Sequence, residues 1–229
     1  MPEVLVLCEG QTEKEFCNSV VKEHMSLRGV ELSGTLVGKP QRKQGGIRPW
    51  RAYRRELLRL AAERRDRHVA VLVDYYAMPM DWPGREEAVR KPAVDRGLHV
   101  EEKLREDLAN ELPGRFHPCV QLHEFESLLF VDPGASAPVI ALGAGRKDYQ
   151  ALEKRIRDIR AECGGKVELI DDGPGTAPSK RICKIAPGYD KVAFGVLAAA
   201  GAGIDKLRAG CPWLHRWLTE LEDLAKVKP

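Results

Sequence analysis

The sequence predicts an α/β fold: a four-stranded, mainly parallel sheet flanked by helices, followed by a helical C-terminal part. Apolar runs of strand length lie near residues 4–7, 31–37, 68–73 and 116–122, with helical patterns between them. Strands that alternate with helices favour a parallel sheet with right-handed crossovers. Later patterns are almost all helical. We therefore expect an α/β core over residues 1–135 and a mostly helical extension, packed on this core, over residues 136–229.

The first half of the chain justifies the core element by element. The first apolar run ends at Cys8-Glu9-Gly10, as in a buried parallel strand that breaks at glycine. Thr12 and Glu15 have the spacing of a capping box, which predicts a helix from there to about residue 27. A basic, glycine-flanked loop over residues 38–46 follows the second strand. Apolar spacing then predicts a helix over residues 48–67.

The remaining elements follow from similar patterns. The third strand is followed by a Pro/Gly-broken loop over residues 78–91 and a helix over residues 98–108. A short apolar helix follows the fourth strand, and a charged helix covers residues 148–162. A turn-rich segment then leads to the basic sequence Lys180-Arg181-Ile182-Cys183-Lys184. The tail, residues 189–227, has a helical pattern throughout, with an apolar stripe that includes Trp213 and Trp217.

Composition narrows the class of protein without naming a function. The 229 residues carry a formal net charge of +3, too small to argue for nucleic-acid binding by itself. The six cysteines form no Cys-x-x-Cys pair, which argues against a zinc site or a disulfide framework. Neither a signal-peptide pattern nor an apolar run of membrane-spanning length is present. We expect a cytoplasmic protein that does not enter a membrane.

Acidic residues follow three of the predicted strands. Glu9 ends the first, Asp74 the third, and Glu124 and Glu126 follow the fourth. In an open parallel sheet, ligands bind beyond the carboxyl ends of the strands. Carboxylates gathered there repel one another unless a cation neutralises them, and hard oxygen ligands suit Mg²⁺ or Mn²⁺. The alternative is that each acid caps a helix or pairs with an arginine.

Four segments carry a family resemblance. They are Cys8-Glu9-Gly10-Gln11-Thr12-Glu13, Leu72-Val73-Asp74-Tyr75-Tyr76, His123-Glu124-Phe125-Glu126 and Gly173-Pro174-Gly175-Thr176-Ala177-Pro178-Ser179-Lys180. The first resembles the glutamate motif of Toprim domains, which occur in topoisomerases, primases and OLD-type nucleases and bind Mg²⁺. Together the four resemble an uncharacterised bacterial family with a Toprim-like fold. That family includes the effector nuclease of PARIS-type antiphage systems, which an ATPase partner holds and which attacks tRNA when released.

The resemblance implies roles for two of the acids. Glu9 would be a metal ligand or general base, and Asp74 a metal ligand. Toprim domains typically carry Asp-x-Asp, whereas this chain has Asp74-Tyr75-Tyr76. Glu124, Glu126 or Asp81 could supply the missing ligand; if none does, the site is degenerate.

Basic residues suggest where phosphate would bind. Lys180 and Lys184 are four residues apart at an expected helix start, so both could face one phosphate, with Arg181 beside them. Resemblance to Toprim nucleases suggests that Lys180 stabilises charge in the transition state. A second patch on the helix over residues 48–67 comprises Arg51, Arg54, Arg55, Arg59 and Arg64. It could neutralise nucleic-acid phosphates, dock an acidic partner, or pair with acids of its own helix.

Three functions are compatible with these residues. The first is a metal-dependent nuclease acting on RNA or DNA, with Glu9, Asp74 and Glu124 or Glu126 holding the ion. The second is a catalytically degenerate regulatory module that binds an ATPase partner. The third and weakest is nucleotidyl transfer, for which the sequence offers no nucleotide pocket. The apolar C-terminal helix also makes self-association plausible.

Overall fold

The computed structural model describes residues 1–38, 46–122, 124–170 and 175–226. The predicted basic loop lies almost wholly outside these residues, as do His123 and the Gly173-Pro174 pair. By compactness the chain divides into Met1–Leu122 with Arg216–Pro229, and His123–His215. The sequence places the boundary near residue 135, whereas this division comes directly after the last strand. The reason is that the segment after that strand packs on the helices that follow it.

The first unit contains a four-stranded sheet in the order β2-β1-β3-β4. Its strands are β1 (Glu3–Cys8), β2 (Glu31–Leu36), β3 (His68–Asp74) and β4 (Phe116–Gln121). All three pairings are parallel, so the predicted α/β class and parallel sheet are confirmed. Strand β3 is buried along almost its whole length, as expected for a central strand covered on both faces.

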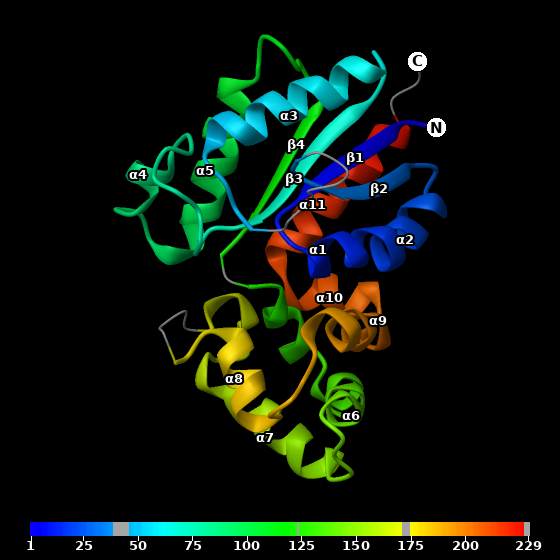
Figure 1. Cartoon of the computed structure of the whole chain (residues 1–229), viewed down its shortest axis with the longest axis vertical. Helices are drawn as coiled ribbons and strands as arrows, with labels where there is room; N and C mark the ends of the chain where they lie inside the picture. Colours follow the sequence, from blue (N-terminus) through cyan, green and yellow to red (C-terminus); the bar gives the residue numbers. More distant parts are fainter. Residues whose placement is uncertain (39–45, 123, 171–174, 227–229) are drawn as a thin grey trace. The chain divides into compact units, whose positions relative to one another are not determined.

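Helices cover both faces of this sheet. They are α1 (Gln11–Phe16), a π-helical turn (Cys17–Val21), α2 (Lys22–Ser26), α3 (Trp50–Glu63), α4 (Arg85–Ala88), α5 (Ala93–Asp107) and most of α11 (Pro212–Asp223), which a 3-10 turn (Leu224–Lys226) follows. Figure 1 shows α3 and α5 on one side of the sheet and α1, α2 and α11 on the other. The α3 face buries Tyr53 and Leu57 against Val71 and Val73 of β3.

Several helix boundaries differ from those predicted. The capping box is wrong: α1 begins after Gly10, which has an extended backbone, and no side chain caps it. Helix α3 begins after Pro49 and ends where Arg64 turns extended, so it is shorter than residues 48–67. Helix α5 begins directly after Pro92, five residues earlier than predicted, because proline fixes the conformation that precedes a first turn. Helix α4 forms within the predicted loop over residues 78–91.

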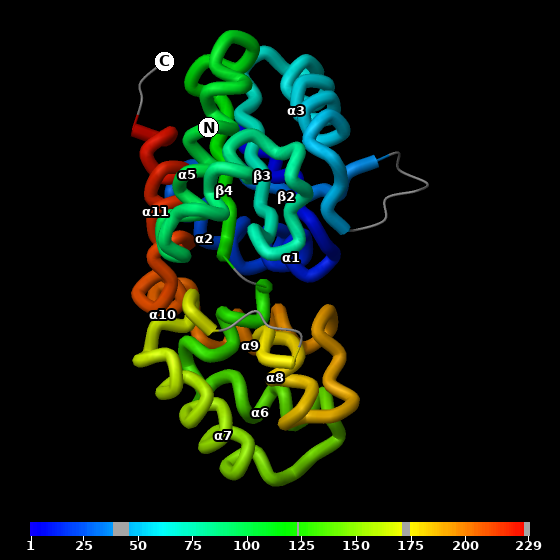
Figure 2. Tube along the Cα trace, turned by 90° about the vertical axis from the view of Figure 1, so that its left-hand side faces the viewer, coloured from blue at the N-terminus to red at the C-terminus, as the bar shows by residue number. Residues whose placement is uncertain are grey.

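The second unit is helical. Its elements are 3-10 helices over Phe125–Phe130 and Val167–Leu169, a π-helical turn over Lys191–Gly195, and the helices α6 (Pro133–Gly143), α7 (Tyr149–Glu162), α8 (Pro178–Ile185), α9 (Val196–Ala202) and α10 (Ile204–Gly210). Helix α6 packs against both α7 and α9, and all three can be followed in Figure 2.

The C-terminal tail is not one continuous helix. It is divided at Gly203, whose positive φ of 79° ends α9, and again at Cys211 before α11 begins. The apolar stripe of the last helix is buried, with Trp217 only 2% exposed. The Trp217 indole donates to the carbonyl of His117 in β4, which ties α11 to the sheet. Within the described part of the chain, no helix has both the length and the apolar character needed to span a membrane.

Candidate metal centre

Two predicted acids meet at the carboxyl edge of the sheet. Strands β1 and β3 are neighbours; Glu9 directly follows β1, and Asp74 is the last residue of β3. The Asp74 backbone N–H donates to Oε2 of Glu9 at 3.0 Å. The Glu9 N–H continues the strand ladder by donating to Leu72 at 3.1 Å. Parallel strand order therefore brings the Glu9 carboxylate to the backbone of Asp74, although the two residues are far apart in the sequence.

A side chain from β4 holds the second carboxylate. Gln121 lies opposite Asp74 in the strand register, and its Nε2 donates to Oδ1 of Asp74. Asp74 is 8% exposed and Gln121 is 1% exposed. The amide oxygen of Gln121 is buried and has no hydrogen-bond partner among the described residues. Buried polar atoms nearly always have a partner, so this oxygen indicates an incomplete polar site.

A third carboxylate and a tyrosine lie near Glu9. Glu13, in the first turn of α1, is buried, and its Oε2 lies 2.7 Å from the point that a Cβ on Gly10 would occupy. Gly10 thus leaves room for this carboxylate. Burial, and next the negative charge of Glu9, raise the pKa of Tyr53 well above its ordinary value. Its buried hydroxyl therefore remains a proton donor beside an acidic site.

The described residues contain no group of three or more His, Cys, Asp or Glu side chains arranged to hold one metal ion. Asp81 does not add a ligand, because its Oδ2 accepts the backbone N–H of Trp50 at 2.9 Å and so caps α3. Tyr76 stands where the resemblance would place a second aspartate, and it is 47% exposed. The first unit thus offers two acidic residues at neighbouring strand ends, with the Gln121 amide beside the second of them.

The second unit holds the other predicted site residues. The Ser179 backbone N–H, at the start of α8, donates to Oε2 of Glu124 at 2.8 Å. Because Ser179 directly precedes Lys180, this bond places Glu124 at the N-terminal end of α8, close to Lys180. Lys180 and Lys184 are exposed on α8, whereas Arg181 pairs with Glu162 at 2.5 Å.

Glu126 lies deeper in the same unit. It is 1% exposed, and Nζ of Lys191 lies 3.6 Å from its Oε1. Burial, and next the charge of Glu126, raise the pKa of Tyr189, whose hydroxyl is also buried. A carboxylate this deep needs a compensating charge, which Lys191 supplies in part from a half-exposed position.

A family model described as "Domain of unknown function (DUF4276)" matches residues 8–222, a range that includes Glu9, Asp74, Gln121 and Glu124. The chain belongs to the DUF4276 family. Two solved structures are similar to this DUF4276 chain. The C-terminal region of the Burkholderia pseudomallei OLD protein is 16% identical, with a TM-score of 0.48, and the match covers 97% of this chain and 98% of that one. The C-terminal region of the Xanthomonas campestris pv. campestris OLD protein is 15% identical, with a TM-score of 0.47 and coverages of 97% and 95%. No curated protein matches the chain.

The predicted arginine patch of this DUF4276 chain is largely neutralised by acids. Arg54 pairs with Asp107 and Glu111, Arg59 with Glu56 and Glu63, and Arg64 with Glu3 and Asp66. Arg51 and Arg55 are exposed on α3. Only these two arginines of the patch, within the described residues, have no ion pair.

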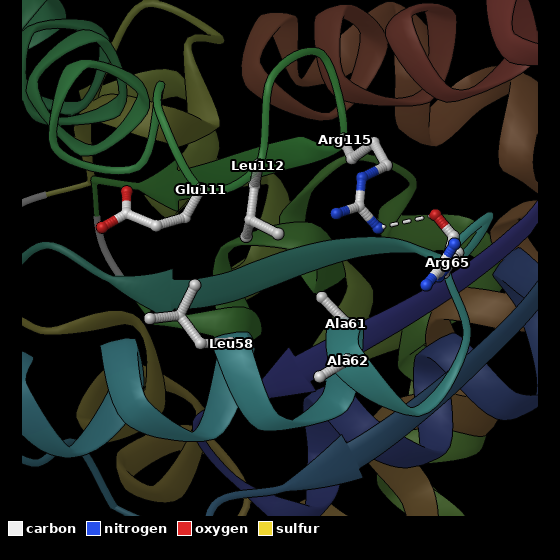
Figure 3. Close-up of a pocket in the computed structure, with 7 residues that line it drawn as sticks. All are labelled: Leu58, Ala61, Ala62, Arg65, Glu111, Leu112 and Arg115. Carbon is white, nitrogen blue, oxygen red and sulfur yellow. Dashed lines mark hydrogen bonds between the residues drawn. The ribbon is translucent and has the colours of Figure 1, made fainter.

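A pocket lies at the opposite edge of the sheet. Figure 3 shows its apolar floor, which includes Leu58 and Leu112, and the guanidinium groups of Arg65 and Arg115 at its border. Arg115 donates to the Arg65 carbonyl at 3.0 Å, so its side chain holds the turn together. Because Arg115 precedes β4, the pocket lies at the amino ends of the strands and is separate from the carboxylate pair.

Sequence reasoning missed two residues of the DUF4276 site. Gln121 is polar within an otherwise buried strand end, and that contrast is the signal that could have identified it. Glu13 lies in the first turn of the helix that follows Glu9, and this closeness in the chain could have suggested a shared site.

Proposed function

We propose that this DUF4276 chain is a divalent-metal-dependent nuclease of the Toprim type. The observation that carries the proposal is the pairing of Glu9 with Asp74 at the carboxyl ends of adjacent parallel strands. Ligands of open α/β sheets bind at this edge. Acidic residues gathered at one sheet edge repel one another, and a cation relieves that repulsion.

The donor set suits Mg²⁺ or Mn²⁺. Magnesium retains several waters and is commonly held by one or two carboxylates together with substrate phosphates. Glu9 and Asp74 of the first unit would hold the ion; Glu124 and Glu126 of the second unit are candidate ligands from the sequence alone. A bound ion would supply an activated water and stabilise negative charge on the phosphoryl group. Glu9 is the candidate general base, because its carboxylate is the more exposed of the pair.

Nucleic acid is the proposed substrate. Lys180 and Lys184 lie on one face of α8 and would contact phosphate, with Lys180 stabilising charge in the transition state. Arg51 and Arg55 would contact other phosphates of the same nucleic-acid strand. Arg181 is a weaker candidate, because it is already paired with Glu162. The proposed substrate is RNA or DNA. The sequence resemblance to the PARIS effector nuclease adds tRNA as a substrate to test, and an antiphage defence role in the cytoplasm.

Metal binding is the first test. We would titrate Mn²⁺ into the native chain, Glu9→Gln and Asp74→Asn by calorimetry, with Glu23→Gln as the matched control because Glu23 is exposed on α2. We expect both site variants to lose binding and the control to keep it. The same four proteins would then be incubated with Mn²⁺ and tRNA, single-stranded RNA or plasmid DNA. Full cleavage by Glu9→Gln would overturn the assignment.

A second function is favoured by one observation. Among the described residues, no three His, Cys, Asp or Glu side chains are grouped to hold one ion, and Tyr76 stands where the resemblance would place a second aspartate. A chain that had lost catalysis would serve as a regulatory module bound to an ATPase partner. This alternative predicts that the native chain and Glu9→Gln bind Mn²⁺ equally weakly, and that neither cleaves any of the three substrates.

A further inference from the structure

The side-chain amide of Gln121 has one of its two polar atoms satisfied. Gln121 ends β4 and is 1% exposed. Its Nε2 donates to Oδ1 of Asp74, but its Oε1 is buried without a hydrogen-bond partner among the described residues. A buried amide oxygen of this kind calls for a donor, a water or a cation.

The orientation of this amide follows from its neighbour. A carboxylate only accepts hydrogen bonds, so the Gln121 group that faces Asp74 must be the NH₂ and not the oxygen. Turning the amide over would place two acceptors against each other. Nε2 and Oε1 share one carbon atom, so the oxygen necessarily lies beside the Asp74 carboxylate.

Two contacts fix the position of the backbone that carries the Gln121 side chain. The Gln121 carbonyl accepts the N–H of Tyr75 at 2.7 Å, which extends the β3–β4 ladder past Asp74. On the preceding residue, the Val120 N–H donates to the buried carboxylate of Glu101 at 2.9 Å. The backbone at the end of β4 is thus held by neighbours on both sides.

We infer that Gln121 is the third protein oxygen of the metal centre: its NH₂ orients Asp74, and its Oε1 contacts the cation or a water bound to it. This inference rests on the proposed function, because it assumes an ion at Glu9 and Asp74. A neutral amide oxygen is an ordinary ligand for hard divalent cations. It also brings an oxygen from the adjacent strand to a site that lacks a second aspartate.

Two substitutions distinguish the role of the Gln121 amide oxygen from that of its NH₂ group. Gln121→Met keeps the length of the side chain and removes both polar atoms. Gln121→Glu keeps an oxygen and adds a negative charge, but it loses the N–H that faces Asp74. We expect Gln121→Met to weaken Mn²⁺ binding by about tenfold to a hundredfold in calorimetry. Gln121→Glu should bind at least as tightly as the native chain.

The outcomes are distinct. If Gln121→Glu is as weak as Gln121→Met, the amide serves only to orient Asp74 and the inference is wrong. Unchanged binding by Gln121→Met would equally overturn it. If the native chain shows no Glu9-dependent binding, the proposed function fails first and the inference falls with it.

A measurement on the native chain protects the test against a variant that does not fold. Paramagnetic Mn²⁺ broadens nearby NMR signals. We expect substoichiometric Mn²⁺ to broaden the side-chain NH₂ signals of Gln121 before those of Asn110. Asn110 lies between α5 and β4, before the amino end of that strand, and serves as the distant reference. Equal broadening of the two would contradict the inference.

Discussion

Replacing Arg216 by methionine should expose how strongly the buried carboxylate of Glu101 depends on its partner. Glu101 lies on α5 and is 2% exposed. It accepts the Val120 N–H at 2.9 Å and pairs with the Arg216 guanidinium at 3.2 Å. Strand β4 is at the edge of the sheet, so Glu101 supplies the partner that a neighbouring strand would otherwise provide.

The expected loss of stability can be bounded. Removing one partner of a fully buried ion pair costs about 3–5 kcal/mol. Arg216 is 41% exposed, so water screens part of the attraction, and we expect about 2 kcal/mol. Glu101→Gln keeps an acceptor for Val120 and removes the charge. In that background Arg216→Met should cost less than about 0.5 kcal/mol, as at a neutral surface site.

The penalty should also depend on pH. Burial raises the pKa of Glu101, while the charge of Arg216 opposes this shift. Removing Arg216 therefore raises the pKa of Glu101 in the folded state further. A folded carboxyl that holds its proton more tightly than the unfolded one makes stability fall as pH rises above the unfolded pKa. The penalty should be full at pH 8 and smaller at pH 5.

Urea unfolding followed by tryptophan fluorescence would measure both effects, with Arg51→Met as the control for loss of an exposed, unpaired arginine. A double-mutant cycle of Glu101→Gln and Arg216→Met isolates the coupling between the two. An equal penalty at pH 5 and pH 8, or additive single substitutions, would refute this account of the pair.

Three further predictions concern single contacts. Gly97→Ala would place a Cβ 2.6 Å from the Val120 carbonyl, so we expect a lower melting temperature and, because Gln121 is the next residue, weaker Mn²⁺ binding; an unchanged melting temperature would contradict this. Burial, and then the neighbouring His117, lower the pKa of His68 in the folded state, so stability should fall as pH drops below about 6.5, and His68→Gln should flatten this dependence in acid-unfolding curves. Asp190 accepts the N–H groups of two residues that follow it, and Asp190→Ala should cost about 1 kcal/mol in urea unfolding.

The sequence predicted the sheet and half of the site because these depend on local patterns. Four apolar runs of strand length alternate with helices, and topology rules make such strands parallel. Once the strands are parallel, acids that directly follow them must share an edge. That reasoning placed Glu9 and Asp74 together without any knowledge of side-chain contacts.

Helix starts were predicted less well, because competing local signals look alike in sequence. Thr12 and Glu15 match a capping box, yet the helix begins directly after Gly10, and Thr12 is buried within it. Tight packing decides the matter: Gly10 leaves room for the Glu13 carboxylate. The sequence contains residues that could begin a helix at either Gly10 or Thr12, but it does not show how tightly the neighbouring side chains pack there.

The tertiary structure alone decided which polar side chains are committed to partners. The sequence left Asp81 as a candidate metal ligand, but in the structure its carboxylate caps α3 by accepting the Trp50 N–H. Three arginines of the predicted patch are paired with acids. Gln121 and Asp74 are 47 positions apart, and only strand register brings them into contact. Apolar periodicity is a property of neighbouring residues, so the sequence by itself determined the fold class. Hydrogen-bond partners are chosen by positions in space, so the candidate metal centre could be completed only once the strands were in place.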